Sequence, residues 1–262
     1  ELPKDIWKTN YYKNDFEENL TNLKNKKIAI FIGAHNKFSE KETLSISNFA
    51  KSWNAPVFCD YVSNYNGDNK VLTYQVLNTQ RFKNKPDLII DIGDLSDNRA
   101  LFTGQEVWRI SPNGEFKSRC DRPVSKTFHC LEKTFFDLLL NNEKPYNNYY
   151  QEINTSIEKL KEPELPLCNG FICQKLAQFL PKNCSLHLAI LNSFKNMNYF
   201  KLDKTIETNC NVGGFGIDGA ISTLIGQSLC NPEKIFFGLV GDLAFFYDMN
   251  ALGQREIKNN VR

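Results

Sequence analysis

Residues 209–250 read NCNVGGFGIDGAISTLIGQSLCNPEKIFFGLVGDLAFFYDMN, and this stretch decides how the second half of the chain is expected to fold. It opens with a cluster of four glycines, continues with an apolar run of helical character, and then has the apolar residues 235–240, which predict a buried strand. Glycines that open a helix let backbone N–H groups approach an anion, which the helix dipole also favours. The strand delivers Asp242 to its carboxyl end, where α/β proteins bind ligands. These features predict a site for a nucleotide-like or diphosphate cofactor.

The composition is that of an ordinary globular protein. Hydrophobic residues make up 41% of the 262 residues and charged residues 24%, and the net charge is +2. Lysines are spread along the chain rather than clustered, which argues against a nucleic-acid partner. No apolar run is long enough to span a membrane, and the N-terminus does not resemble a signal peptide. The eight cysteines include no Cys-x-x-Cys pair and the three histidines are scattered, so we expect reduced thiols, a cytoplasmic protein and no zinc site.

The first 160 residues alternate between strand and helix patterns. Apolar runs predict strands at 27–33, 55–60, 86–94 and 106–110, and helices are expected at 15–23, after Ser39 to Glu42, and at 128–141. This alternation predicts an α/β fold with a doubly wound parallel sheet, in which residues 1–160 form a central Rossmann-like domain. Only one glycine, Gly33, follows the first strand, so we expect no nucleotide in this domain.

The second half is expected to be a separate domain. Residues 141–166 are rich in Asn, Glu, Lys, Tyr and Pro, which predicts an interdomain connector carrying one short helix. Beyond it, the pattern predicts a helix at 170–180, strands at 186–191 and 205–210, and then the glycine stretch. So few strands make an incomplete parallel sheet. We therefore expect residues 161–262 to be the first part of a second α/β domain, one that binds a diphosphate.

Two features of the glycine stretch allow more than one interpretation. The glycines at 214, 216 and 219 match the Gly-x-Gly-x-x-Gly fingerprint of dinucleotide-binding proteins, with Asp242 near the distance expected of a ribose-binding acid. That fingerprint normally follows a hydrophobic strand, whereas residues 207–211 are largely polar. An NAD(P)-dependent oxidoreductase is therefore one alternative, and glycines that serve only a tight helix–strand contact are another. Asp242 suits a hard cation such as Mg²⁺ bridging a diphosphate, or it caps the next helix.

The order of these motifs resembles the thiamine-diphosphate-dependent enzymes. The resemblance rests on Asn-x-Gly-x-x-Gly-Ile-Asp-Gly at 211–219, Gly-Asp-Leu at 241–243 and Asp-x-Asn-x-Leu at 248–252. Within that family it is most similar to the SEPHCHC synthases (2-succinyl-5-enolpyruvyl-6-hydroxy-3-cyclohexene-1-carboxylate synthases) of menaquinone biosynthesis. Weaker similarity extends back to residues 191–194 and to residues 86–99. The resemblance implies a cytoplasmic homodimer or homotetramer that decarboxylates a 2-oxo acid and transfers the carbanion to an acceptor.

The resemblance also implies roles for individual residues. Asp242 would be the first Mg²⁺ ligand, and Ile217 would be the bulky residue that bends the cofactor into its reactive shape. Arg99 would pair with a substrate carboxylate, and Ser193 would hydrogen-bond the substrate; a surface arginine and a turn serine are the alternatives. The expected cofactor-binding residues are Gly216, Ile217, Asp218, Gly241, Asp242, Leu243 and Ala244.

The sequence departs from the family at several cationic positions. Where those enzymes have arginine or lysine, this chain has Val212, Met197 and Asn98. Loss of positive charge from a site for multiply charged acids predicts a different or less anionic substrate.

Two parts of a thiamine-diphosphate site are not expected within these residues. The family's catalytic glutamate belongs to a domain that would precede Glu1, and its second Mg²⁺ ligand would lie beyond Arg262. We therefore expect a fragment that is inactive on its own. A non-catalytic domain pair kept for assembly or binding is the alternative from another functional class.

Overall fold

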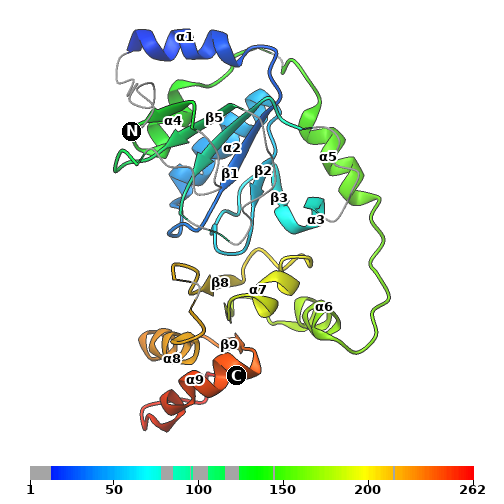
Figure 1. The fold of residues 1–262 in the computed structure, drawn as a ribbon, viewed down its shortest axis with the longest axis vertical. Helices are drawn as coiled ribbons and strands as arrows, with labels where there is room; N and C mark the ends of the chain where they lie inside the picture. Colours follow the sequence, from blue (N-terminus) through cyan, green and yellow to red (C-terminus); the bar gives the residue numbers. More distant parts are fainter. Residues whose placement is uncertain are drawn as a thin grey trace, which may run out of the picture. The chain divides into compact units, whose positions relative to one another are not determined.

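The chain forms two compact units, Glu1–Lys161 and Glu162–Arg262 (Figure 1), and each is described by itself. The computed structural model describes residues 13–77, 85–94, 96, 106–115, 124–143, 145–214 and 216–262. Within this part of the chain, no helix is both long and apolar enough to cross a membrane. The seven cysteines that it includes are all free.

The first unit is built on a six-stranded parallel sheet with the order β3-β2-β1-β4-β5-β6. The central strands are apolar and buried, as expected of a sheet covered on both faces. This confirms the predicted α/β fold with a doubly wound parallel sheet. The strands are β1 (Ile28–Ile32), β2 (Val57–Cys59), β3 (Lys70–Leu72), β4 (Leu88–Ile92), β5 (Glu106–Ile110) and β6 (Lys126–Phe128).

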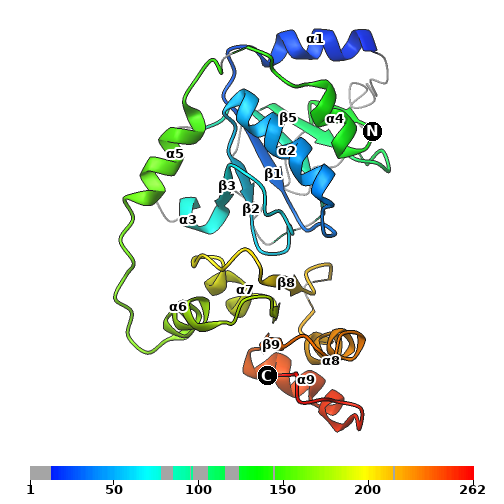
Figure 2. The same ribbon diagram turned by 180° about the vertical axis from the view of Figure 1, so that it is seen from behind.

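Helices cover both faces of this sheet, which is seen from the other side in Figure 2. On one face, Phe49 and Phe135 of α2 and α4 pack in the larger core cluster. On the other face, Tyr149 and Ile153 of α5 belong to a second cluster. The helices of this unit are α1 (Lys13–Leu23), α2 (Glu40–Trp53), α3 (Thr73–Leu77), α4 (Glu132–Leu138) and α5 (Tyr149–Glu158).

Two helix predictions for this unit were wrong, and the strands β3 and β6 were not predicted. The helix predicted at 128–141 is shorter, because Phe128 ends strand β6 and α4 begins only at Glu132. Strand β3 was missed, since it has only three residues and follows a polar, Asn-rich loop. The helix predicted within an interdomain connector is α5, whose buried side chains belong to the core of the first unit.

The second unit contains a three-stranded parallel sheet with the order β8-β7-β9. Its strands are β7 (Ser185–Leu188), β8 (Glu207–Cys210) and β9 (Phe236–Leu239). Beyond β9, Val261 makes a parallel bridge to Phe236. The helices are α6 (Asn169–Phe179), α7 (Asn192–Met197), α8 (Ala220–Cys230) and α9 (Asp242–Asp248), and the 3-10 helix Met249–Gly253 follows α9.

Candidate functional site

The glycine loop connects β8 to α8 at the carboxyl edge of the second sheet. The Asn211 carboxamide closes this loop, because its Nδ2 donates to the Gly219 carbonyl at 3.1 Å and to Thr223 Oγ1 at 3.0 Å. Gly219 has a φ of 79°, in the left-handed region that favours glycine. A Cβ atom added at Gly213 or Gly214 would meet nothing within 4 Å. The loop is therefore fixed at its ends, while its first glycines border open space.

The predicted cofactor residue Ile217 lies where the loop meets both neighbouring strand ends. It is partly buried and packs against Ala189, Ala220 and Ala244, together with Val240. These residues come from the segment after β7, the start of α8, the first turn of α9 and the segment after β9. The cluster therefore brings Ile217 to the same edge of the sheet as the turn that carries Asp242.

The two predicted residues on either side of Ile217 contact each other. A Cβ atom at Gly216 would collide with Asp218 Oδ1, so the carboxylate folds back over the glycine. A side chain at position 216 would make this exposed carboxylate turn away.

Asp242 is the first residue of α9 and is exposed to solvent. The N-cap of α9 is Gly241, so the structure does not support the alternative in which Asp242 serves as the helix cap. Asp242 Oδ1 accepts a hydrogen bond from the Leu243 N–H at 2.9 Å. Leu243 is exposed, whereas Ala244 is buried in the cluster around Ile217. Asp242 thus presents a carboxylate to solvent at a strand end.

The chemistry of this site fits a hard cation that also binds a phosphate. Carboxylate oxygen is a preferred ligand of Mg²⁺, which usually takes one or two protein carboxylates and completes its shell with phosphates and water. Among the described residues there is no group of three or more His, Cys, Asp or Glu side chains that could hold a metal without such help. A single exposed carboxylate such as Asp242 suits a metal whose other ligands include a diphosphate and water.

The N-terminus of α8 is already occupied by a protein carboxylate. The backbone N–H of Ser222 donates to Asp248 Oδ2 at 2.6 Å, and the Ser222 hydroxyl bonds the other carboxylate oxygen. The sequence predicted that an anion binds where the glycines open this helix. The Ser222 amide is not available to such an anion, because it already donates to Asp248.

The two predicted substrate-binding residues have different outcomes. Ser193 is the second residue of α7, four positions after Ala189, and is partly exposed. The turn before α7 places Leu191 at a φ of 61°, so the chain bends sharply as it leaves β7. Arg99 and its neighbour Asn98 lie outside the described residues, and the predicted role of Arg99 stays a prediction.

Comparison with known proteins identifies relatives of this segment. A 2-succinyl-5-enolpyruvyl-6-hydroxy-3-cyclohexene-1-carboxylate (SEPHCHC) synthase from Bacteroides fragilis is 36% identical over 188 residues, which are 68% of this chain and 33% of that protein. The corresponding synthase from Flavobacterium johnsoniae is 26% identical over 255 residues, or 90% of this chain and 46% of that protein. The predicted resemblance to the SEPHCHC synthases is confirmed. The chain spans between a third and a half of the length of these two synthases.

A solved structure supports the fold. The thiamine diphosphate-dependent 4-hydroxybenzoylformate decarboxylase of Rhodococcus jostii RHA1 matches with a TM-score of 0.57 at 14% identity, covering 92% of this chain and 48% of that one. At this identity the match speaks for the fold alone. No protein-family model matches the chain.

The strand order argues against the dinucleotide alternative. In a dinucleotide-binding fold, the strand before the glycine fingerprint and the strand that carries the ribose-binding acid are neighbours. Here β8 precedes the glycines and β9 leads to Asp242, but β7 lies between them. Asp242 therefore lies one strand too far from the glycine loop to act as the ribose-binding acid of a dinucleotide fingerprint.

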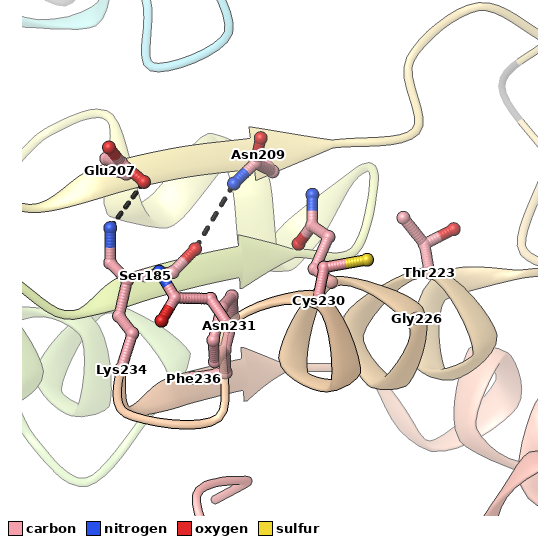
Figure 3. Close-up of a pocket in the computed structure, with 10 residues that line it drawn as sticks. Ser185, Glu207, Asn209, Thr223, Gly226, Cys230, Asn231, Lys234 and Phe236 are labelled. Atoms are coloured by element: carbon pink, nitrogen blue, oxygen red, sulfur yellow. Dashed lines mark hydrogen bonds and ion pairs between the residues drawn. The ribbon is translucent and has the colours of Figure 1, made fainter.

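A separate pocket lies toward the opposite end of the same sheet (Figure 3). Its volume is about 570 Å³, and its lining includes Ser185, Glu207 and Phe236, the first residues of their three strands. Two polar contacts span it, between Asn209 and Ser185 at 3.3 Å and between Lys234 and Glu207. None of the predicted cofactor-binding residues lines this pocket.

His187 is a notable residue that the sequence analysis did not single out. It lies on β7, is 1% exposed, and neither ring nitrogen has a hydrogen-bond partner among the described residues. Burial lowers the pKa of His187 to about 4, and the neighbouring Gln227 carboxamide offsets part of that effect. In the sequence, His187 stands out only as a histidine within a predicted strand. That pattern does not tell whether the imidazole is buried or exposed.

Proposed function

We propose that this chain provides the diphosphate-binding side of a thiamine-diphosphate- and Mg²⁺-dependent enzyme. The enzyme would decarboxylate a 2-oxo acid and transfer the resulting carbanion to an acceptor. One observation carries the proposal: Ile217 and Ala244 pack in one cluster, next to an exposed Asp242, at the carboxyl edge of a parallel sheet. The similarity to SEPHCHC synthases and the fold shared with a decarboxylase are in line with it.

Each residue has a specific task in this proposal. Asp242 would hold Mg²⁺ against the diphosphate, and the backbone of Leu243 and Ala244 would face the same phosphates. Ile217, which packs against Ala189 and Ala220, would present its remaining surface to the cofactor. The cap residue Gly241, beside which there is open space, would leave room for the cofactor's approach, and Gly216 and Asp218 would border the cofactor on the loop side. Bound thiamine diphosphate supplies the stabilisation of the carbanion.

The substrate would differ from that of the SEPHCHC synthases. The positions at which the resemblance implies arginines hold Met197, which is fully buried, and Val212, which is 7% exposed. Apolar side chains packed into the protein cannot neutralise a substrate carboxylate. We therefore expect a less anionic 2-oxo acid or acceptor, with Ser193 and Arg99 as the remaining candidates for substrate contacts.

The resemblance also suggests the setting of the full-length protein. We expect a cytoplasmic homodimer or homotetramer with its cofactor between subunits, in which a glutamate from another domain activates the cofactor. The free cysteines are in line with a reducing compartment.

Calorimetric titration of the full-length protein tests the proposal. Thiamine diphosphate with MgCl₂ is expected to give saturable heat, and NAD is expected to give none. A matched variant, Glu256→Gln, removes an exposed charge that is not among the predicted site residues and should bind like the wild type. Heat with NAD alone would favour the oxidoreductase alternative, and no heat with either ligand would favour the non-catalytic one.

A further inference from the structure

Helix α8 begins without a cap of its own. Its N-cap residue is Gly219, which has no side chain and makes no side-chain capping bond. The first amides of a helix have no partner within the helix, and a side-chain oxygen from the N-cap normally accepts from the second or third of them. The first amides of α8 are therefore open to an acceptor from another segment or to water.

Asp248 supplies the missing acceptor from another helix. Ser222 is the third residue of α8, and its backbone N–H donates to Asp248 Oδ2 at 2.6 Å. The Ser222 hydroxyl bonds the second carboxylate oxygen. A negative charge at a helix N-terminus is also favoured by the helix dipole. Asp248 thus caps α8 although the two residues are 26 positions apart.

This cap joins the two halves of the proposed cofactor site. Asp248 is the last residue of α9, and Asp242 is the first, so one short helix links the cap to the proposed metal ligand. The helix rises about 9 Å between these two residues. On the other side, α8 begins directly after the loop that carries Ile217, and Asn211 ties that loop to Gly219. The bond between Asp248 and Ser222 therefore adds a polar link between the Ile217 loop and the Asp242 turn, beside the apolar packing of Ile217 with Ala220 and Ala244.

We propose that Asp248 is a positioning residue that holds the glycine loop and the Asp242 turn in register for the cofactor. Asp248 acts through α8 and α9 and is not expected to touch the cofactor itself. The effect of Asp248 on cofactor binding rests on the proposed function. The link that Asp248 makes between the glycine loop and the Asp242 turn does not depend on it.

Hydrogen exchange of the full-length protein without cofactor tests the link directly. In Asp248→Ala, amide exchange should rise about 5- to 30-fold, the effect of losing a helix cap, both in segment 216–222 and in segment 242–248. Asp248→Asn retains an acceptor oxygen and should give a smaller rise. Glu256→Gln, the matched control, should leave both segments unchanged. Unchanged exchange in both segments of Asp248→Ala would overturn the proposal, whether or not the protein binds a cofactor.

Titration with thiamine diphosphate and MgCl₂ then tests the consequence for binding. If the wild type binds, the dissociation constant of Asp248→Ala should rise by roughly the same 5- to 30-fold, and Asp248→Asn should restore most of the affinity. Wild-type affinity in Asp248→Ala, despite faster exchange, would overturn the positioning role. A wild type that does not bind would instead count against the proposed function, and the exchange result would still decide the link.

Discussion

The buried histidine on β7 leads to a quantitative prediction about pH and stability. Burial lowers the pKa of His187 to about 4, from 6.5 in an exposed histidine. The unfolded chain therefore takes up a proton at a higher pH than the folded protein does. It follows that the free energy of unfolding is not reduced by His187 above pH 6.5, and that it decreases progressively as the pH falls from 6.5 toward 4. That pKa difference corresponds to about 3 kcal/mol of unfolding free energy at most.

The surroundings of His187 explain why this loss should centre on the second unit. Its neighbours in the sheet are Asn209 on β8 and Gly238 on β9, and Gln227 lies beside it on α8. The nearby charged residues Glu207 and Lys234 pair with each other at the pocket. Protonation would place a positive charge beneath α8 without a carboxylate partner among these neighbours, which is costly in a buried site.

Urea unfolding between pH 7.5 and 4.5 measures the effect. Circular dichroism follows both units, whereas tryptophan fluorescence follows the first unit, since all three tryptophans belong to it. We expect the wild type to lose stability in the circular dichroism transition as the pH falls, and His187→Gln to lose much less. His129→Gln, in which the replaced histidine is exposed, is the matched control and should behave like the wild type. Equal pH dependence in the wild type and His187→Gln would refute this reasoning.

Three further predictions concern stability. Gly238→Ala would place a Cβ 2.6 Å from Leu224 Cδ2, and we expect the crowding to lower the unfolding free energy by about 1–3 kcal/mol in urea titrations; an unchanged midpoint would contradict this. Ser39→Ala removes the capping box of α2 and should lower the unfolding free energy of the first unit, followed by fluorescence, by about 1 kcal/mol. An unchanged transition would show that the capping box does not stabilise this unit. Burial lowers the pKa of His35, but hydrogen bonding to Glu132 and to a backbone carbonyl raises it above 6.5 overall. The stabilisation from protonated His35 is therefore complete below pH 6.5 and is lost as the pH rises through the raised pKa. His35→Gln should remove this pH dependence of the unfolding free energy, and the same dependence in the variant would argue against a stabilising pair of His35 and Glu132.

Strong local patterns made much of the first unit predictable. The apolar run Ile28–Ile32 forms a fully buried strand, as expected in a parallel sheet. The Ser39 and Glu42 side chains form both halves of a capping box, so the start of α2 could be read directly. Where local signals were ambiguous, the prediction failed. Phe128 and Phe135 have helical spacing, but they meet across two elements, with ring centroids 4.8 Å apart.

The candidate site was predictable only in part, because some of its links join residues that are distant in the sequence. The glycine loop and Asp242 carry recognisable motifs, and the resemblance pointed to Ile217. The alanines at 189, 220 and 244 that surround Ile217 carry no chemical signature. The bond between Asp248 and Ser222 spans two helices, so no local pattern could reveal it.

The position of the bound metal tests the central claim most directly. Crystals of the full-length protein grown with thiamine diphosphate and Mn²⁺, a substitute for Mg²⁺ that scatters anomalously, would locate the ion in an anomalous difference map. The account predicts a peak bonded to the Asp242 carboxylate, with the diphosphate on the same ion and the cofactor resting on Ile217. A cofactor whose metal lies away from Asp242, or whose ring system does not touch Ile217, would contradict it.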